Sequence, residues 1–178
     1  MKEYTMKAKT IISALLIITS LVACSQAVKI PPRADNFAFV FEDAPCGGIP
    51  MNVLDSANKT LTRTPIGNSH STTISLSLTN DELESIYQKA MSIGFFDYPS
   101  EFIIPDKQVI GHHSPASTYK LSLINGEMTN SVTWHDDTMT KPSYTEADQL
   151  RELMNLIEKT IQSHPEIKQL PVQQAQCA

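Results

Sequence analysis

The Asn125–Gly126 dipeptide is the feature that most limits how this chain can fold, because it lies between two stretches of alternating apolar residues. An Asn-Gly pair in this setting favours a two-residue type I′ hairpin turn, which would place Leu123 opposite Met128. Only Asn130 would interrupt the shared face. The other side chains expected on that face are Tyr119, Leu121, Leu123, Met128, Val132 and Trp134.

Four further segments before the hairpin have the pattern of strands. The first is apolar on both faces, which is typical of a central strand. In the second, Ile49, Met51 and Val53 are apolar at alternate positions, while Pro50 restricts the strand to an edge or a late start. The third is only a candidate return strand. In chain order the segments are 37–41, 49–53, 59–64 and 72–78.

Two helices are expected from their apolar periodicity. Thr79 and Glu82 match a capping box at the first helix start, and Gly94 matches its end. Ser143 and Glu146 suggest a second capping box. The expected buried residues are Leu83, Ile86, Tyr87, Ala90 and Met91 in the first helix, and Ala147, Leu150, Met154, Ile157 and Ile161 in the second.

This order of elements predicts an α+β fold. We expect an antiparallel sheet of about five strands with two helices packed on one face, a two-layer sandwich. Residues 99–117 read as a long irregular loop, and a loop of that length is functional or mobile.

The first 23 residues have the organisation of a secretion signal. Lysines precede a short apolar run over 11–18, which is too short to serve comfortably as a permanent membrane span. Either Met1 or Met6 would provide a sufficient charged start.

The run ends at Leu21-Val22-Ala23-Cys24, which resembles the lipobox of bacterial lipoproteins. The resemblance implies cleavage before Cys24 and lipidation of that cysteine. Ser25 at the following position implies transfer to the outer membrane, facing the periplasm. We therefore expect a signal peptide over 1–23, a lipidated cysteine and tether over 24–36, and a single α+β domain over 37–178.

The charge of the chain argues against nucleic acid as a partner. The first 24 residues hold three lysines and one glutamate, so the remainder carries a formal charge of −7, against −5 for the whole chain. A nucleic-acid-binding domain needs a basic face. Solubility is the simplest reason for the acidic balance.

The two remaining cysteines, Cys46 and Cys177, are predicted to form a disulfide in an oxidising compartment. A loop of that length would stabilise the fold by about 4–5 kcal/mol on the chain-entropy argument. Two free thiols are the alternative.

Several of these features together resemble a family of bacterial envelope and lipoprotein domains whose function is not established. They are the Cys46–Pro50 turn, the capped helix that ends in a glycine and aromatic residues, the hairpin, and the closing helix. The resemblance covers most of residues 37–162. It implies the fold and supplies no catalytic residues.

No catalytic, metal-binding or nucleotide-binding motif is present, and no cofactor is expected. His112, His113 and His135-Asp136-Asp137 are the residues best suited to bind a metal ion or to act in catalysis. No helical i, i+4 histidine pair supports a metal site. Solvated loop positions are the simpler interpretation.

Two functions remain open from the sequence. The first is a non-catalytic envelope module that binds a partner or has a structural role. The second is a small secreted hydrolase or metal-binding protein that uses His112, His113 and His135. The candidate binding loop for the first comprises Phe102, Ile103, Ile104, Val109, Ile110, His112 and His113.

Overall fold

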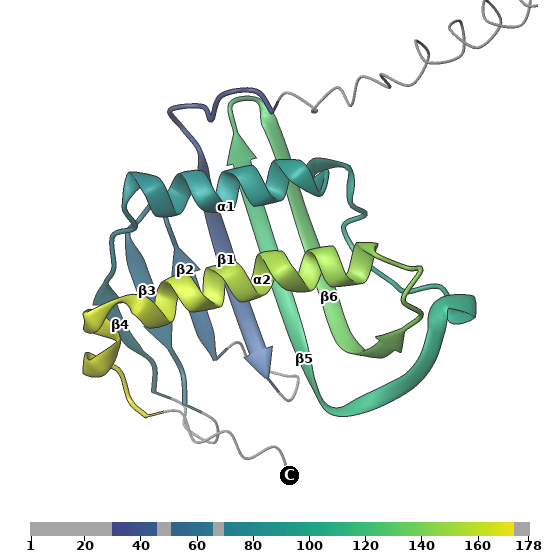
Figure 1. Cartoon of the computed structure of the whole chain (residues 1–178). Coiled ribbons are helices and arrows are strands. Elements are labelled where there is room, and N and C mark those ends of the chain that lie inside the picture. The colour runs from purple at the N-terminus through teal and green to yellow at the C-terminus, as the bar shows by residue number, and fades with distance from the viewer. Residues whose placement is uncertain (1–29, 46–50, 66–69, 173–178) are drawn as a thin grey trace, which may run out of the picture.

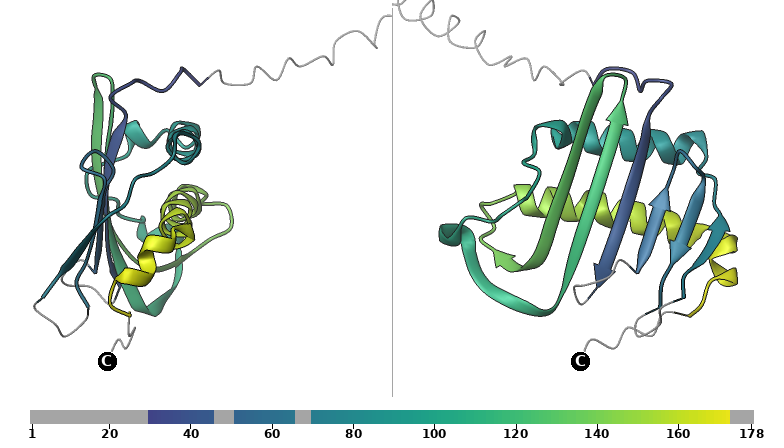
Figure 2. Two further views of the ribbon diagram at one scale, coloured as in Figure 1. Left: turned by 90° about the vertical axis from the view of Figure 1, so that its left-hand side faces the viewer. Right: turned by 180° about the vertical axis from the view of Figure 1, so that it is seen from behind.

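A computed structural model describes residues 30–45, 51–65 and 70–172. In these residues six strands form one sheet in the order β4-β3-β2-β1-β5-β6, and neighbouring strands are antiparallel (Figure 1). Viewed edge-on, both α-helices lie on the same side of the sheet (Figure 2). The elements are β1 (Ala38–Pro45), β2 (Asn52–Asp55), β3 (Thr60–Arg63), β4 (Thr72–Ser75), α1 (Asn80–Ser92), β5 (Val109–Asn125), β6 (Met128–Thr140) and α2 (Glu146–Ser163).

The predicted α+β class, with an antiparallel sheet and two helices, is confirmed. The described residues hold six strands where about five were expected, because the candidate return strand over 59–64 does form, as β3. No helix in the described part of the chain has the length and apolar character that crossing a bilayer requires.

Cross-strand register arranges the side chains of the helix-facing side of the sheet in rows. The row in the middle of the sheet is apolar and forms the centre of the core: Ile74, Leu61, Leu54, Phe41, Leu121 and Val132. The next row, two residues along each strand, is largely polar: Thr72, Arg63, Asn52, Asp43, Tyr119 and Trp134. Arg63, Asn52 and Asp43 are nevertheless buried, so they need polar partners within the domain.

The apolar alternation that includes Met51 and Val53 does not mark the inward side of β2. The inward residues of that strand are Asn52 and Leu54, whereas Val53 is half-buried and Met51, just before the strand, is 4% exposed. Asn52 points inward because its side chain donates to Asp43 Oδ2 at 2.6 Å and accepts from Arg63 Nε at 2.8 Å.

The first capping box is confirmed and the second is wrong. Glu82 N donates to Thr79 Oγ1 at 3.2 Å, and Thr79 N donates to Glu82 Oε2 at 2.7 Å. Helix α2 instead has Thr145 at its N-cap, without a side-chain capping bond, so Ser143 lies too early to cap it. The predicted buried stripe of α2 is confirmed in full.

The hairpin forms, but its turn is displaced from the predicted position. Asn125 pairs with Met128, and Leu123 lies opposite Asn130 rather than Met128. The turn residues are Gly126 and Glu127. Gly126 has a φ of 65° and Glu127 does not have a positive φ, the pattern of a type II′ turn. Because the register moves by two residues, the predicted residues still share one face, but Met128 at the tip is 39% exposed.

Asn125 becomes part of β5 because the segment that precedes β1 binds its side chain. Ala34 N donates to Asn125 Oδ1 at 2.8 Å, and the Asn125 side chain is buried. Asn36 adds a reciprocal pair: its Nδ2 donates to Gly126 O at 3.1 Å, and its Oδ1 accepts from Gly126 N at 2.8 Å. The hairpin tip and the segment before β1 thus hold each other in position through these hydrogen bonds.

Residues 30–36, expected to belong to the tether, therefore contact the domain. Tyr87 of α1 donates its hydroxyl to Pro31 O at 2.7 Å. Arg33 forms an ion pair with Glu84 at 3.1 Å and lies over the Phe37 ring. We call these contacts, with those of Ala34 and Asn36 at the hairpin tip, the N-terminal clamp.

The clamp predicts that Asn36→Ala lowers the free energy of unfolding by about 1 kcal/mol, because two partly solvated hydrogen bonds are lost. Urea unfolding followed through the fluorescence of the single tryptophan, Trp134, would measure it. The exposed neighbour provides a control, since Asp35→Ala should change stability by less than about 0.5 kcal/mol. Equal effects of the two substitutions would contradict the clamp.

Candidate functional site

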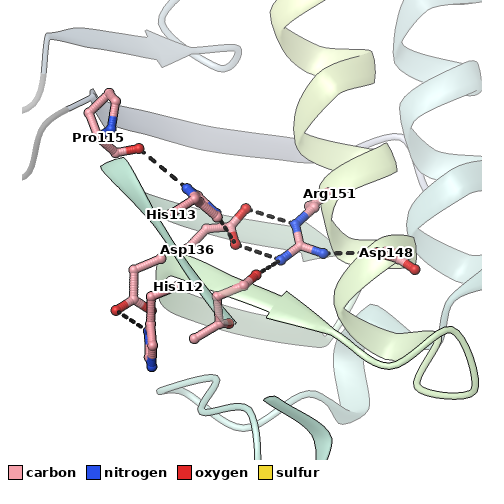
Figure 3. A network of polar contacts seen from close by, with 8 residues as sticks. His112, His113, Pro115, Asp136, Asp148 and Arg151 are labelled. Carbon is pink, nitrogen blue, oxygen red and sulfur yellow. Dashed lines mark hydrogen bonds and ion pairs between the residues drawn. The ribbon is translucent and has the colours of Figure 1, made fainter. Parts of the chain in front are cut away.

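The end of the hairpin distant from its turn is held to α2 by one ion pair. Arg151 donates from Nε to Asp136 Oδ2 at 2.9 Å and from Nη2 to Asp136 Oδ1 at 2.7 Å. The same guanidinium donates to Thr138 O and to Asp148 Oδ1, both at 2.8 Å (Figure 3). Its carbon Cζ lies 5.0 Å from the centre of the Trp134 ring.

These contacts make Arg151 a fixed charge rather than a mobile surface group. The hydrogen bond to Asp136 is the main reason that the pKa of Arg151 is raised, against the opposing effect of burial. A bidentate pair with a carboxylate is geometrically specific. Arg151 and Asp136 therefore set the position of α2 relative to the end of β6.

Part of the predicted irregular loop is strand. Residues 109–117 belong to β5, so the prediction of a loop over 99–117 is wrong in its second half. The register with β6 shifts between Val109 and Gly111 and again between His112 and Ser117. Such irregularities break the alternation of side chains and bend the strand. The strong curvature of β5 is visible in Figure 2.

The bend places two of the three candidate histidines beside the aspartates of β6. His112 Nδ1 lies 3.4 Å from Asp137 Oδ2, and His113 Nε2 lies 3.7 Å from Asp136 Oδ1 (Figure 3). The His112 side chain is 69% exposed. Exposed ion pairs of this kind contribute little to stability.

The third candidate, His135, has a different partner. Its Nδ1 lies 2.9 Å from Thr118 Oγ1. The histidines are thus near one end of the hairpin, but each contacts a different group. In the described part of the chain, no three histidine, cysteine, aspartate or glutamate side chains are arranged to hold a metal ion.

The apolar residues of the candidate binding loop divide into two groups. Phe102 and Ile104 are buried at 7% exposure each and belong to the core, while Ile103 is 69% exposed. Ile110 is 62% exposed and Val109 is half-buried. Phe102 and Ile104 therefore anchor the loop to the core, while Ile103 and Ile110 are exposed to solvent.

A pocket of about 250 Å³ lies between this loop and β6. Its volume suits one or two side chains and is below the usual range for drug-sized ligands or cofactors. Of the three candidate histidines, only His135 lines it. The lining residues are Glu101, Phe102, Ile103, Ile104, Thr118, Thr133, Trp134, His135, Asp137 and Thr138.

A second polar cluster consists of Asp43, Asn52, Arg63 and Tyr119 of the polar row together with Glu158 of α2. Burial raises the pKa of Asp43, against the effects of the Asn52 hydrogen bond and the Arg63 charge. Burial and then the charge of Asp43 raise the pKa of Glu158 to about 7. Burial, followed by the charge of Glu158, raises the pKa of Tyr119 to about 12.

Sequence reasoning missed Arg151 and Glu158, although a signal was present. Arg151 is four residues after Ala147 and three before Met154, and Glu158 is four after Met154. Both therefore fall on the buried stripe of α2. A charged residue on such a stripe requires a partner inside the fold.

No protein-family model and no curated protein matches this chain. The resemblance to a family of envelope domains accordingly stays a prediction. Cys24, Cys46 and Cys177 lie outside the described residues, so the lipidation and the disulfide also stay predictions.

The ion pair between Arg151 and Asp136, which anchors α2 to β6, predicts that Arg151→Leu destabilises the domain by about 2–3 kcal/mol. The Asp136 carboxylate would stay buried but lose its charged partner. Chemical unfolding would measure the loss. Asp148→Ala should cost less than about 0.5 kcal/mol, because Asp148 is 55% exposed. An Arg151→Leu effect as small as that of Asp148→Ala would show that the pair is not an anchor.

The polar cluster predicts that stability falls as the pH rises. The pKa of Glu158 is about 7 in the folded chain, against an ordinary value of 4.5, so folding favours its protonated form. This contribution is fully present below about pH 4.5 and is lost as the pH rises through about 7. Glu158→Gln should flatten that decline in unfolding experiments from pH 5 to 8.

A matched control lies on the same helix. Glu152 is 64% exposed and pairs with Lys89, so Glu152→Gln should leave the pH dependence in place. An unchanged slope in Glu158→Gln would exclude Glu158 as its source.

Proposed function

We propose that the protein is a lipid-anchored lipoprotein of the bacterial envelope, in the outer membrane and facing the periplasm, whose domain is a non-catalytic module that binds a partner protein. The leader over 1–23 and the lipobox that ends at Cys24 support the anchor. The arrangement predicted from the sequence, with both helices on one face of the sheet, agrees with the edge-on view (Figure 2).

The observation that carries the proposal is the N-terminal clamp, because with a lipid on Cys24 it would set which end of the domain faces the bilayer. Ile30 is the first described residue and packs against the core. Six residue steps separate Cys24 from Ile30, and they can span at most roughly 20 Å. A lipid on Cys24 would therefore hold the hairpin tip close to the membrane surface.

The pocket lies toward the opposite end of the same strands. The pocket-lining residues of β6 begin at Thr133 and end at Thr138, which follow Met128, the first residue of the strand, by five and ten residues. This corresponds to about 17 to 33 Å along the strand at 3.3 Å per residue. The pocket would thus face away from the bilayer. This is the position from which an anchored module can reach another protein.

Site-specific photo-crosslinking in intact cells tests the proposal. A photoreactive residue at Ile103, on the pocket, should give a reproducible crosslink to one envelope protein, identified by mass spectrometry. Ile110 is a matched control, because it is a similarly exposed isoleucine that does not line the pocket. No crosslink at either position, or equal patterns at both, would contradict a binding function for the pocket.

The same strain series tests the anchor separately. Cys24→Ser should release the protein from the membrane fraction and abolish incorporation of a clickable fatty acid. The wild-type chain should carry that label. A wild-type chain that stays unlabelled would disprove the lipoprotein assignment.

A further inference from the structure

The outer side of β6 is an incompletely covered sheet edge. β6 is the last strand of the sheet and has 13 residues, whereas β4 at the opposite edge has four. A long edge presents backbone donors and acceptors that can pair with another chain. Proteins commonly shorten or cover such edges, so an open stretch beside a pocket has functional interest.

The loop before β5 covers this edge at only one point in the described structure. Phe102 N donates to Thr133 O at 2.9 Å, and Thr133 N donates to Ser100 O at 2.8 Å. This is a parallel bridge between Glu101 and Thr133. Beyond Thr133, no described segment pairs with the outer side of β6.

Strand geometry identifies the peptide groups that remain open. Thr133 directs its N–H and C=O outward, and groups on one edge of a strand recur at every second residue. The register between β5 and β6 is continuous from Thr133 to Asp136. The peptide group of His135 therefore also points outward, next to the pocket. Burial continues to alternate from Asp136 to Thr138 within β6, which places the peptide group of Asp137 on the same edge.

The pocket has different chemistry on the two faces of the sheet. Toward the core it is lined by Phe102, Ile104 and Thr138. Thr138 is 9% exposed, and its Oγ1 has no hydrogen-bond partner among the described residues. Toward the open face lie the carboxylates of Glu101 and Asp137. His135 comes between them along the edge, because Glu101 pairs with Thr133. The lining contains no lysine or arginine.

We infer that the edge of β6 at His135–Asp137 binds an extended, basic segment of a partner protein as an added strand. Side chains of a strand alternate between faces. Apolar side chains of the added strand would enter the pocket beside Phe102 and Ile104, and basic side chains would face Glu101 and Asp137. Main-chain hydrogen bonds would supply the pairing, as in other cases of strand addition.

This inference rests on the proposed function, because it names the chemistry of the partner at the same pocket. The pocket volume fits one or two side chains rather than a whole ligand. The proposal therefore assigns the attachment mainly to backbone pairing, with the pocket selecting the side chain.

The probe is a fluorescent seven-residue peptide that alternates lysine and valine and is blocked at both ends. It would be titrated into the full-length protein in non-ionic detergent and followed by fluorescence anisotropy. The expected result is saturable binding that weakens with added salt, because charge attraction between exposed groups is screened. Hydrogen exchange should slow at the amides of His135 and Asp137.

Two altered peptides separate backbone pairing from side-chain binding. Methylation of alternate peptide nitrogens on the pairing edge removes donors and should weaken binding about tenfold, equivalent to about 1.4 kcal/mol. A peptide with glutamate in place of lysine should also bind at least about tenfold more weakly. Equal binding of the methylated peptide, or no binding of the parent peptide, would overturn the inference.

Protein variants provide the complementary test. His135→Pro removes an outward N–H that the β5 pairing does not use, a substitution that edge strands tolerate. It should abolish the slowed exchange at Asp137 and weaken binding, whereas His135→Ala keeps the N–H and should bind normally. Asp137→Lys is a second variant at a half-buried rim position, and it should reduce the preference for the lysine peptide.

The outcome is distinguishable from that of the proposed function. If Ile103 crosslinks one envelope protein in cells but His135→Pro leaves that crosslink intact, the pocket binds a partner and strand addition is wrong. If the lysine peptide binds as described but no cellular crosslink forms, the edge has the predicted chemistry and the proposed envelope function fails.

Discussion

The antiparallel pairing of β5 with β6 is the constraint on which the rest of the structure depends. These two strands supply one edge of the sheet and the buried side chains of Leu121, Val132 and Trp134. At one end, the turn is bound by the segment that precedes β1. At the other, the bend in β5 brings its exposed histidines to the aspartates of β6. A single hairpin thus connects the N-terminal clamp with the candidate binding edge.

The sequence predicted the hairpin face and the apolar stripes well, because burial of apolar residues repeats at the periods of strands and helices. It failed where polar side chains occupy inward positions. Asn52 points into the core to connect Asp43 with Arg63, so the apolar alternation that includes Val53 does not mark the inward side of β2. Asn125 likewise carries a turn signal but is taken into the strand by Ala34.

Bulges account for the other failure. A strand is recognised by strict alternation, and the two register shifts between Val109 and Ser117 remove it, so the first half of β5 looked like loop. The candidate binding loop therefore includes the first residues of β5, which are irregular in register but belong to a strand. The edge of β6 could not have been identified from residues at all, since it depends on which strand is last in the sheet.

The same periodicities, applied to polar residues, would have found much of what was missed. Asp43 continues the inward alternation of Phe39 and Phe41, and Arg151 and Glu158 continue the buried stripe of α2. Charged residues at inward positions cost free energy unless they are paired, so each one marks an interaction that the fold must supply.

These inward charges gather at one end of the domain, and they are satisfied unequally. Asp136 has a bidentate arginine, whereas Asp43 has an asparagine amide and faces Glu158, whose pKa is displaced to about 7. The apolar row of the sheet lies nearer the hairpin tip, and the polar row lies nearer the bend of β5. Local opening requires the least free energy where apolar contacts are few. The end of the domain that carries the open edge and the pocket is therefore also the end best able to adjust when another chain pairs with it.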